Sequence, residues 1–305
     1  MAKITAAIHP VAPFDFELTA GYHTYFRGRY GTDSLVDGAY RRLLDLNGTL
    51  ALASVRSVGQ VDKPELALEL RGEGLSSQDV AMAADRVAWI LGTKQSLTPF
   101  YALADGDPEL PAIVKRFYGL HLPHTASVFE ALVLAIMGQQ IASNVAHIIR
   151  SLLIETYGPR QTRDGETYYA FPRPESLLAA SLEDLRGLKL SFRKAEYIQG
   201  IAAAALDGSG GLESLHWSDD DDVLRRLRAL RGVGPWTAQW VLVRALGRPD
   251  AFPLGDLALR RVVSRLYFDG ADLTDAALQH FSQRWSPWRT YVTAYLFAAL
   301  RNGMV

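Results

Sequence analysis

The stretch that decides the fold is L-R-A-L-R-G-V-G-P-W-T-A-Q-W, residues 227–240. Apolar residues recur at helical spacing on both sides of Gly232-Val233-Gly234, so the pattern predicts two helices joined by a tight turn. Glycine tolerates positive φ angles and leaves the neighbouring backbone N–H groups uncovered. Pro235 is favoured in the first turn of a helix. Exposed amides at a helix N-terminus bind anions, so the turn is a candidate anion site as well as a plain connection.

Charge is distributed unevenly along the 305 residues, whose net charge is −1. Residues 225–305 contain twelve arginines and five aspartates, a net charge of +7, so the preceding 224 residues carry −8. This basic segment suits a polyanion, although a solvated arginine-rich surface would give the same count. A nucleic-acid phosphate is the anion that best fits the Gly-Val-Gly turn, because backbone contacts position a protein without reading sequence.

The composition excludes several classes of chemistry. The chain has no cysteine, which removes disulfides, thiolate nucleophiles, zinc–cysteine sites and cysteine-held iron–sulfur clusters. No apolar run approaches the ~20 residues that span a bilayer, and the N-terminus is a poor secretory signal. With 49% hydrophobic and 21% charged residues, we expect a globular cytoplasmic protein of about two domains.

The first part of the chain, residues 1–106, is predicted to form a small α+β domain. Residues 49–58 and 65–71 alternate apolar and polar side chains, as half-buried strands of an antiparallel sheet do. Residues 33–46 and 76–91 have helical spacing, and the second of these segments begins with capping residues.

The remainder, residues 107–305, is predicted to be almost entirely helical. Short segments rich in Gly, Pro and Asp separate the helical patterns. Gly138 lies inside the longest pattern and marks a point where that helix is expected to break. The predicted helices are 108–118, 125–157, 174–186, 191–206, 219–231, 235–246, 256–268 and 274–302, the last with a break.

A loop with the sequence F-P-L-G-D, residues 252–256, precedes the helical pattern that begins at Leu257. Asp256 is therefore expected to be the N-cap of that helix, which is a sufficient structural reason for an aspartate there. The same position stabilises the charged carboxylate through the helix dipole. An anion held in this way also suits the stabilisation of a developing positive charge, so the cap and a chemical role are compatible.

The lysines and aromatic residues are placed very differently. All six lysines lie before residue 195, so none is available in residues 195–305 to form a Schiff base beside the turn. Most buried aromatic side chains belong to a core, but a subset lining a cleft could stack on a base or hold a cationic base by cation–π attraction. The aromatic residues of this segment include Trp236, Trp240, Trp285, Trp288, Tyr291, Tyr295 and Phe297.

Several stretches together resemble the helix-hairpin-helix DNA glycosylases, and among them the bacterial alkylation-repair enzymes of the DNA-3-methyladenine glycosylase II type. The matching stretches are 119–123 (GLHLP), 129–130 (FE) leading to 136–140 (IMGQQ), 185–198 (LRGLKLSFRKAEYI), 227–240, 252–260 and 284–289 (RWSPWR). The resemblance implies a mostly α multidomain fold, with an N-terminal antiparallel sheet domain similar to half of a TATA-binding protein. Two helical lobes would follow, with a helix-hairpin-helix at about 219–246 and a catalytic loop at about 250–260.

The resemblance also implies a reaction, the flipping of alkylated bases such as 3-methyladenine out of duplex DNA and hydrolysis of the N-glycosidic bond. Asp256 matches the family's catalytic aspartate, which would stabilise the oxocarbenium-like sugar. Trp236 stands where bifunctional relatives carry a Schiff-base lysine, so the product would be an abasic site without strand cleavage. Base-pocket positions are matched by Tyr22, Gln139, Trp236, Trp240 and Phe297, and DNA-binding positions by Arg231, Gly232, Val233, Gly234 and Gln140.

Three positions depart from the family's pattern. Gln140 stands where the DNA-3-methyladenine glycosylase II type has an apolar wedge, which fills the gap left by the flipped base. Ile141 or Met137 is therefore an alternative wedge. Phe297 replaces a larger tryptophan, and Gly255 replaces an acidic neighbour of the catalytic aspartate. These differences affect the range of substrates more than the type of reaction.

Two other functions are alternatives: a non-catalytic helix-hairpin-helix protein that only grips DNA, and a glycosylase for oxidised or deaminated bases. The first gives no reason for Asp256 or for the aromatic residues around it. The missing lysine weighs against the bifunctional oxidised-purine type. We expect a monomer in the bacterial cytoplasm that binds double-stranded DNA and requires no cofactor and no metal held by side chains. A monovalent cation on the hairpin backbone is compatible with this expectation.

Overall fold

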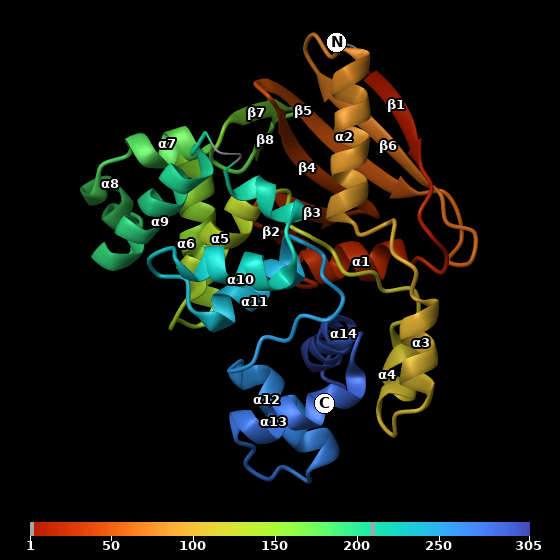
Figure 1. The fold of residues 1–305 in the computed structure, drawn as a ribbon. Helices are drawn as coiled ribbons and strands as arrows, with labels where there is room; N and C mark the ends of the chain where they lie inside the picture. The colour runs from red at the N-terminus through yellow and green to blue at the C-terminus, as the bar shows by residue number, and fades with distance from the viewer. Residues whose placement is uncertain (1–2, 209–210) are drawn as a thin grey trace.

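The computed structural model describes residues 3–208 and 211–305 (Figure 1). It opens with an antiparallel sheet of six strands in the order β1-β6-β5-β4-β3-β2, and helix α2 (Ser77–Ile90) lies across one face of the sheet. The strands predicted over 49–58 and 65–71 are confirmed as β5 and β6. The strands are β1 (Lys3–Ile8), β2 (Arg29–Tyr30), β3 (Asp33–Val36), β4 (Ala39–Leu46), β5 (Thr49–Ser57) and β6 (Leu66–Gly72).

The face of the sheet under α2 forms the core of the N-terminal region. Leu66, Leu68 and Leu70 of β6 are fully buried and alternate with more exposed residues along the strand. They belong to the same buried cluster as Val87 and Ile90 of α2. The buried face of β6, to which every second residue contributes, therefore packs against the buried face of α2 in one apolar layer.

The helix predicted over residues 33–46 is wrong, because these residues form strands β3 and β4. Asp37 and Gly38 both have positive φ angles, 52° and 67°, and make the turn between the paired strands. Such turns match the right-handed twist of a hairpin and favour Asp-Gly. Strand β4 lies inside the sheet and is buried on both faces, so its apolar residues do not alternate and imitate a helical pattern.

A second hairpin lies within the region that was predicted to be helical. β7 (Arg160–Arg163) pairs antiparallel with β8 (Glu166–Tyr169), and Asp164 and Gly165 turn the chain with φ angles of 50° and 79°. Tyr168 joins a small buried cluster with residues of β4 and β5. The hairpin lies between the helices predicted over 125–157 and 174–186, and its signal in the sequence is again an Asp-Gly dipeptide.

The helical patterns are otherwise confirmed, with some divided into shorter helices. The long pattern over 125–157 is two helices, because α5 ends at Gly138 and α6 begins at Ser143. Helices α1 (Phe16–His23) and α3 (Thr98–Asp105) were not predicted. The others are α4 (Leu110–Arg116), α5 (Val128–Gly138), α6 (Ser143–Tyr157), α7 (Pro174–Ala179), α8 (Leu182–Gly187), α9 (Phe192–Ala205), α10 (Asp220–Arg228), α11 (Pro235–Arg244), α12 (Leu257–Tyr267), α13 (Asp275–Ser282) and α14 (Arg289–Arg301).

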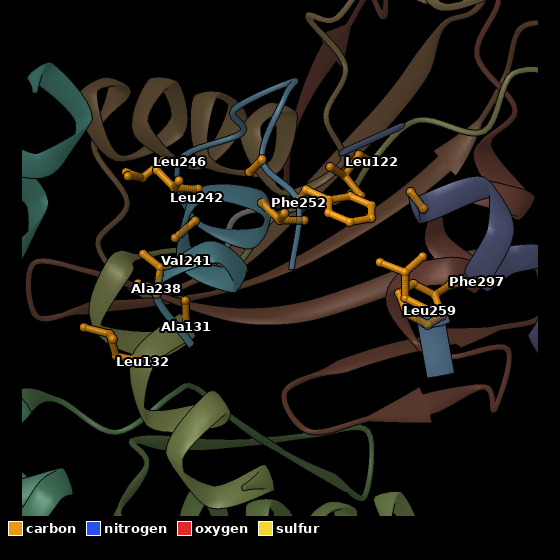
Figure 2. Close-up of a cluster of buried hydrophobic side chains, with 14 of the residues drawn as sticks. Leu122, Ala131, Leu132, Ala238, Val241, Leu242, Leu246, Phe252, Leu259 and Phe297 are labelled. Atoms are coloured by element: carbon orange, nitrogen blue, oxygen red, sulfur yellow. The ribbon is translucent and has the colours of Figure 1, made fainter. Parts of the chain in front are cut away.

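The helices form two groups beside the sheet. Helix α5 contacts α9 and α11 in one group, while α14 contacts α4 and α12 in the other. Figure 2 shows Ala131 of α5 beside Ala238 and Val241 of α11, within a continuous buried cluster that extends to Phe297 of α14. The predicted sheet domain with two helical lobes is confirmed, while the boundary at residue 106 stays a prediction. Within the described ranges, no helix has both the length and the apolar character that crossing a bilayer requires.

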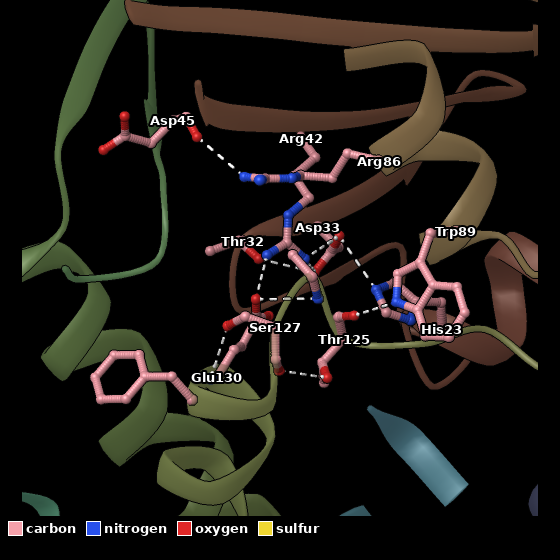
Figure 3. Close-up of polar contacts among 12 residues, drawn as sticks. His23, Thr32, Asp33, Arg42, Asp45, Arg86, Trp89, Thr125, Ser127 and Glu130 are labelled. Atoms are coloured by element: carbon pink, nitrogen blue, oxygen red, sulfur yellow. Dashed lines mark hydrogen bonds and ion pairs between the residues drawn. The ribbon is translucent and has the colours of Figure 1, made fainter. Parts of the chain in front are cut away.

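A buried ionic network joins the sheet to α5 (Figure 3). Arg42 of β4 lies 3.0 Å from the carboxylate of Asp33 on β3 and 2.6 Å from that of Glu130 on α5. The ring of His23 lies 3.2 Å from Asp33. Burial alone would raise the pKa of Asp33, but Arg42 and His23 hold it well below its usual range. Asp33 therefore stays charged beside Arg42, and the network fixes α5 against the sheet.

Candidate active site and DNA-binding hairpin

A cleft of about 710 Å3 lies between the sheet domain and the two groups of helices. Its walls come from the segment that follows α1, from α5 and α6, from α11, from the start of α12 and from the end of α14. This volume is typical of a site for a small molecule or a base. Its aromatic and charged lining includes Tyr22, Tyr25, Arg150, Trp236, Trp240, Arg244, Asp256, Phe297 and Arg301.

Asp256 lies on the wall of this cleft and is the N-cap of α12, as predicted. One carboxylate oxygen, Oδ1, accepts hydrogen bonds from the backbone amides of Ala258 at 3.0 Å and Leu259 at 3.1 Å. The other, Oδ2, accepts a hydrogen bond from the indole Nε1 of Trp236 at 3.1 Å. Three donors therefore fix the carboxylate, and Oδ2 keeps the capacity to accept a further hydrogen bond.

The predicted hairpin connects α10 to α11, and its two glycines have different roles. Gly232 has a φ angle of 87°, and a Cβ atom there would lie 2.3 Å from the ring of Tyr197. Gly234 has an ordinary φ of −88° and is the N-cap of α11, where a Cβ atom would meet no atom within 4 Å. The fold therefore requires Gly232, whereas the open space at Gly234 leaves the backbone accessible to a close partner.

The other predicted DNA-binding positions of the hairpin are Arg231 and Val233. The Arg231 side chain is 78% exposed, and its guanidinium lies 5.9 Å from the ring centre of Tyr197 and 3.8 Å from the Glu196 carboxylate. Val233 is 6% exposed and packs in the helical core, and its N–H donates to the carbonyl oxygen of Leu230 at 3.1 Å, so this residue anchors the turn. Arg231 is the side chain of the hairpin that can reach DNA.

Residues 133–287, about half of the chain, match the HhH-GPD superfamily of base excision DNA repair proteins. The matched region contains both the hairpin and Asp256. The chain belongs to this superfamily.

Individual relatives agree with this assignment. The DNA-3-methyladenine glycosylase of Bacillus subtilis (strain 168) is 35% identical over 204 residues, which are 67% of this chain and 67% of the relative. The DNA-3-methyladenine glycosylase 2 of Escherichia coli (strain K12) is 30% identical over 179 residues, 59% of this chain and 60% of the relative. The structure of a 3-methyladenine DNA glycosylase from Archaeoglobus fulgidus superposes with a TM-score of 0.82 at 29% identity and covers 99% of both chains. The HhH-GPD fold and the resemblance seen in the sequence are confirmed.

The cleft of this HhH-GPD chain brings together four of the five predicted base-pocket residues. The ring centres of Trp236 and Trp240 are 6.1 Å apart, and those of Trp240 and Phe297 are 6.0 Å apart. Arg301 links Tyr22 to this group, because its guanidinium is within 6 Å of the ring centres of both Tyr22 and Phe297. An aromatic wall therefore runs from the Asp256 carboxylate to the end of α14.

Gln139, the fifth predicted pocket residue, is not among the described residues that line the cleft. Its side-chain amide donates hydrogen bonds to the carbonyl oxygen of Gly232 at 2.9 Å and to the hydroxyl of Thr237 at 3.1 Å. The structure therefore places Gln139 as a link between the end of α5 and the hairpin. The motif predicted the position of Gln139 along the chain but not the direction in which its amide points.

The turn between α5 and α6 carries the candidate wedge residues. Gln140 is exposed and has a φ angle of 56°, so it projects at the tip of the turn. Ile141 is half-buried and lines the cleft. Met137 is fully buried in the helical core and cannot reach DNA without unfolding α5, so the proposal of Met137 as a wedge is wrong.

No lysine is found among the described residues that line the cleft. Lys194 is the lysine bonded to the end of α5, where its Nζ donates to the carbonyl oxygens of Gln139 at 2.7 Å and Met137 at 3.0 Å. Burial lowers the pKa of Lys194, and the charge of Arg150 lowers it further. The two carbonyl groups hold this amine as a helix cap, away from the Asp256 wall.

The cleft also has a polar half that the sequence patterns do not predict. Arg150, Arg244 and Arg301 come from three different helices and line the same cavity as Tyr25. Burial by itself would raise the pKa of the Tyr25 phenol, but these three guanidinium groups lower it to about 8. The basic C-terminal segment contained part of this signal, but nothing in the sequence indicated which arginines face inward.

Proposed function

We propose that this chain is a monofunctional DNA glycosylase that removes N-alkylated purines, such as 3-methyladenine, and leaves an abasic site. The observation that carries the proposal is the Asp256 carboxylate, held by three donors on the wall of a cleft large enough for a flipped base. The Bacillus, Escherichia and Archaeoglobus relatives are 3-methyladenine DNA glycosylases by name, which supports the choice of alkylated purines.

In the proposed reaction, the bond between C1′ of the sugar and the base nitrogen breaks, and its electron pair leaves with the base. An alkylated purine is already cationic and becomes neutral as it leaves, so it needs little general acid. The positive charge moves to the sugar, where a fixed carboxylate stabilises it without reorganisation. Water then adds to C1′, and the free acceptor capacity of Asp256 Oδ2 suits orientation of that water.

The absence of a lyase step belongs to the proposal. Trp236 occupies the place where bifunctional members of the superfamily would present a lysine, and its indole N–H is bonded to Asp256. Without an amine beside C1′ no Schiff base can form, so the strand would not be cut. A second candidate, a non-catalytic DNA-binding module, gives no reason for the cleft or for its carboxylate.

DNA is the expected partner, and the hairpin supports a backbone contact. The amide of Gly234 and those of the first turn of α11 would hold a phosphate, with exposed Arg231 nearby in the hairpin. We further propose that the chain acts as a monomer in the bacterial cytoplasm. It would need no cofactor beyond a monovalent cation that backbone carbonyls of the hairpin could bind.

The test is Asp256→Asn, measured as release of free 3-methyladenine from methylated duplex DNA. Asparagine caps a helix about as well as aspartate, so the free energy of unfolding should change by less than ~1 kcal/mol. Loss of the charge should slow release by about 100-fold or more. Asp219→Asn is the matched control, because Asp219 caps α10 in the same way and lies outside the cleft.

Undiminished release by Asp256→Asn would contradict the assigned role of the carboxylate. Borohydride trapping of a covalent protein–DNA adduct by the unmodified chain would contradict the monofunctional assignment. Release of free base without a nick, together with an inactive but folded Asp256→Asn variant, is the expected result.

A further inference from the structure

The Arg301 guanidinium is an unsatisfied cation on the wall of the base cleft. Its Nη1 is buried and has no hydrogen-bond partner, and no other described residue accepts a hydrogen bond from it or forms an ion pair with it. A guanidinium carries five N–H donors, and buried donors without partners are costly and call for an explanation.

Aromatic rings hold this guanidinium in place. The Arg301 carbon Cζ lies 4.1 Å from the ring centre of Tyr25, 4.6 Å from that of Tyr22 and 5.9 Å from that of Phe297. Contacts with ring faces stabilise a cation but do not use its N–H donors. The rings therefore fix the orientation of Arg301 and, while its Nη1 is covered, leave the remaining N–H donors of this cleft-lining guanidinium for a ligand.

Arg42 of β4, the buried arginine of the sheet domain, is paired with carboxylates. Arg42, at 2% exposure, contacts the carboxylates of both Asp33 and Glu130. By contrast, within the described residues neither Arg150 nor Arg244 forms an ion pair with a carboxylate. Arg150, Arg244 and Arg301 thus line the cleft without a carboxylate partner, and a bound ligand can supply hydrogen-bond acceptors there.

We propose that Arg301 is a specificity-determining residue that donates a hydrogen bond to a carbonyl oxygen on the flipped base. The inference rests on the proposed function, since it concerns the base that Asp256 releases. A carbonyl at position 6, as in 7-methylguanine or hypoxanthine, would satisfy the unpaired donors. Bases without that oxygen, such as 3-methyladenine and ethenoadenine, would leave the same donors unsatisfied in the closed pocket.

A base carbonyl fits this place better than a backbone phosphate does. Tyr22 and Phe297, which flank Arg301, belong to the aromatic wall that ends at Trp236 and Asp256. A flipped base is bound between such rings, while the phosphates stay at the mouth of the site. The hairpin at Gly234 already provides open backbone for phosphate contact.

The test compares Arg301→Met with the unmodified chain on four single-lesion duplexes under single-turnover conditions. 7-Methylguanine and hypoxanthine carry the carbonyl oxygen, and 3-methyladenine and ethenoadenine lack it. One member of each pair is cationic in DNA and one is neutral, so the design separates the oxygen from the charge. For each lesion the quantity compared is the ratio of the two rates of base release.

We expect Arg301→Met to lose about 10- to 100-fold on the two oxygen-bearing lesions and less than about 3-fold on the other two, as removal of a charged hydrogen-bond donor predicts. Arg284→Met is the matched control, because Arg284 lies 4.8 Å from the ring centre of Phe281 but outside the cleft. It should leave all four rates unchanged.

A ratio that follows the charge of the base, or one that is equal for all four lesions, would overturn the inference. If the unmodified chain released no alkylated base at all, the proposed function itself would fail, so the two failures are distinguishable. A second measurement needs no variant: free hypoxanthine should inhibit the unmodified chain at least about 10-fold more strongly than free ethenoadenine does. Equal inhibition would also count against Arg301.

Discussion

The two hairpin glycines offer a paired perturbation with opposite expected effects. In Gly232→Ala, a φ angle of 87° costs an L-residue about 1–2 kcal/mol. The added Cβ atom would lie 2.3 Å from the Tyr197 ring, and overpacking of this kind costs about 1–3 kcal/mol. The free energy of unfolding should therefore fall by ~2–5 kcal/mol.

In Gly234→Ala, neither cost applies. The φ angle of −88° is ordinary for alanine, and the new Cβ atom would meet no atom of the chain within 4 Å. Alanine loses the N-cap preference of glycine, at about 0.5–1 kcal/mol, but it also reduces the entropy of the unfolded chain by a similar amount, so stability should change by less than ~1 kcal/mol. The methyl group would, however, occupy the space through which a phosphate approaches the hairpin amides. We expect DNA affinity to fall by about 10- to 100-fold, the equivalent of one charge-assisted hydrogen bond.

Two assays on the same samples decide the matter. Thermal or denaturant unfolding gives stability, and fluorescence anisotropy with a duplex containing an abasic-site analogue gives affinity at a stated salt concentration. Gly106→Ala is the control, because Gly106 also has a negative φ, of −86°, and ends α3 away from the hairpin. A Gly234→Ala variant that binds DNA normally, or one as unstable as Gly232→Ala, would refute the reasoning.

Two further predictions concern the cleft. Trp236→Phe keeps an aromatic ring but removes the indole N–H that bonds Asp256, so base release should slow by about 10-fold or more while DNA affinity is unchanged. The second prediction concerns the pKa of Tyr25, which burial raises and the three arginines of the cleft lower to about 8. Phenolate absorbance should therefore show one tyrosine that titrates near pH 8, and the Tyr25→Phe variant should lack this titration. Because this folded-state pKa lies below the unfolded value, the unfolded chain binds more protons between about pH 8 and 10. The stability of the unmodified chain relative to Tyr25→Phe should therefore rise with pH there, by up to ~3 kcal/mol, and this gain should be lost as pH falls through 8.

Each of these predictions has a control within the cleft. Trp240→Phe removes an indole N–H that has no hydrogen-bond partner, so it should affect release less than Trp236→Phe does. Equal losses for the two variants would show that ring size, not the bond to Asp256, matters. Arg301→Met should move the Tyr25 titration upward, and an unchanged titration would contradict the assigned cause.

Local signals explain which parts of the structure the sequence predicted well. Asp256 was recognised as an N-cap because capping depends on the residues that follow it directly, and the hairpin was recognised because its glycines and Pro235 are contiguous. The errors also have local causes. Residues 33–46 resemble a helix in sequence because a strand buried on both faces loses the alternation of apolar and polar side chains. The Asp-Gly dipeptide within this segment was the signal for a hairpin.

The directions of side chains could not be read in the same way. Gln139 lies where its motif predicted, yet its amide turns to Gly232 and not into the cleft. Met137 shares the same segment as Gln140, but helix α5 buries the first and the turn exposes the second. A difference of a few positions along a helix reverses the face that a residue presents, and tertiary packing decides which face is covered.

The sequence by itself determined the hairpin, the position of Asp256, the lack of a lysine in the last part of the chain and the family that these features resemble. Only the tertiary structure brought Arg150, Arg244 and Arg301 to one wall beside Tyr25. These residues come from the segment after α1 and from α6, α11 and α14, which lie far apart in the chain. Helix caps and turns are set by neighbouring residues, whereas a charge cluster is made by the packing of distant helices, and that packing sets the chemistry of the pocket.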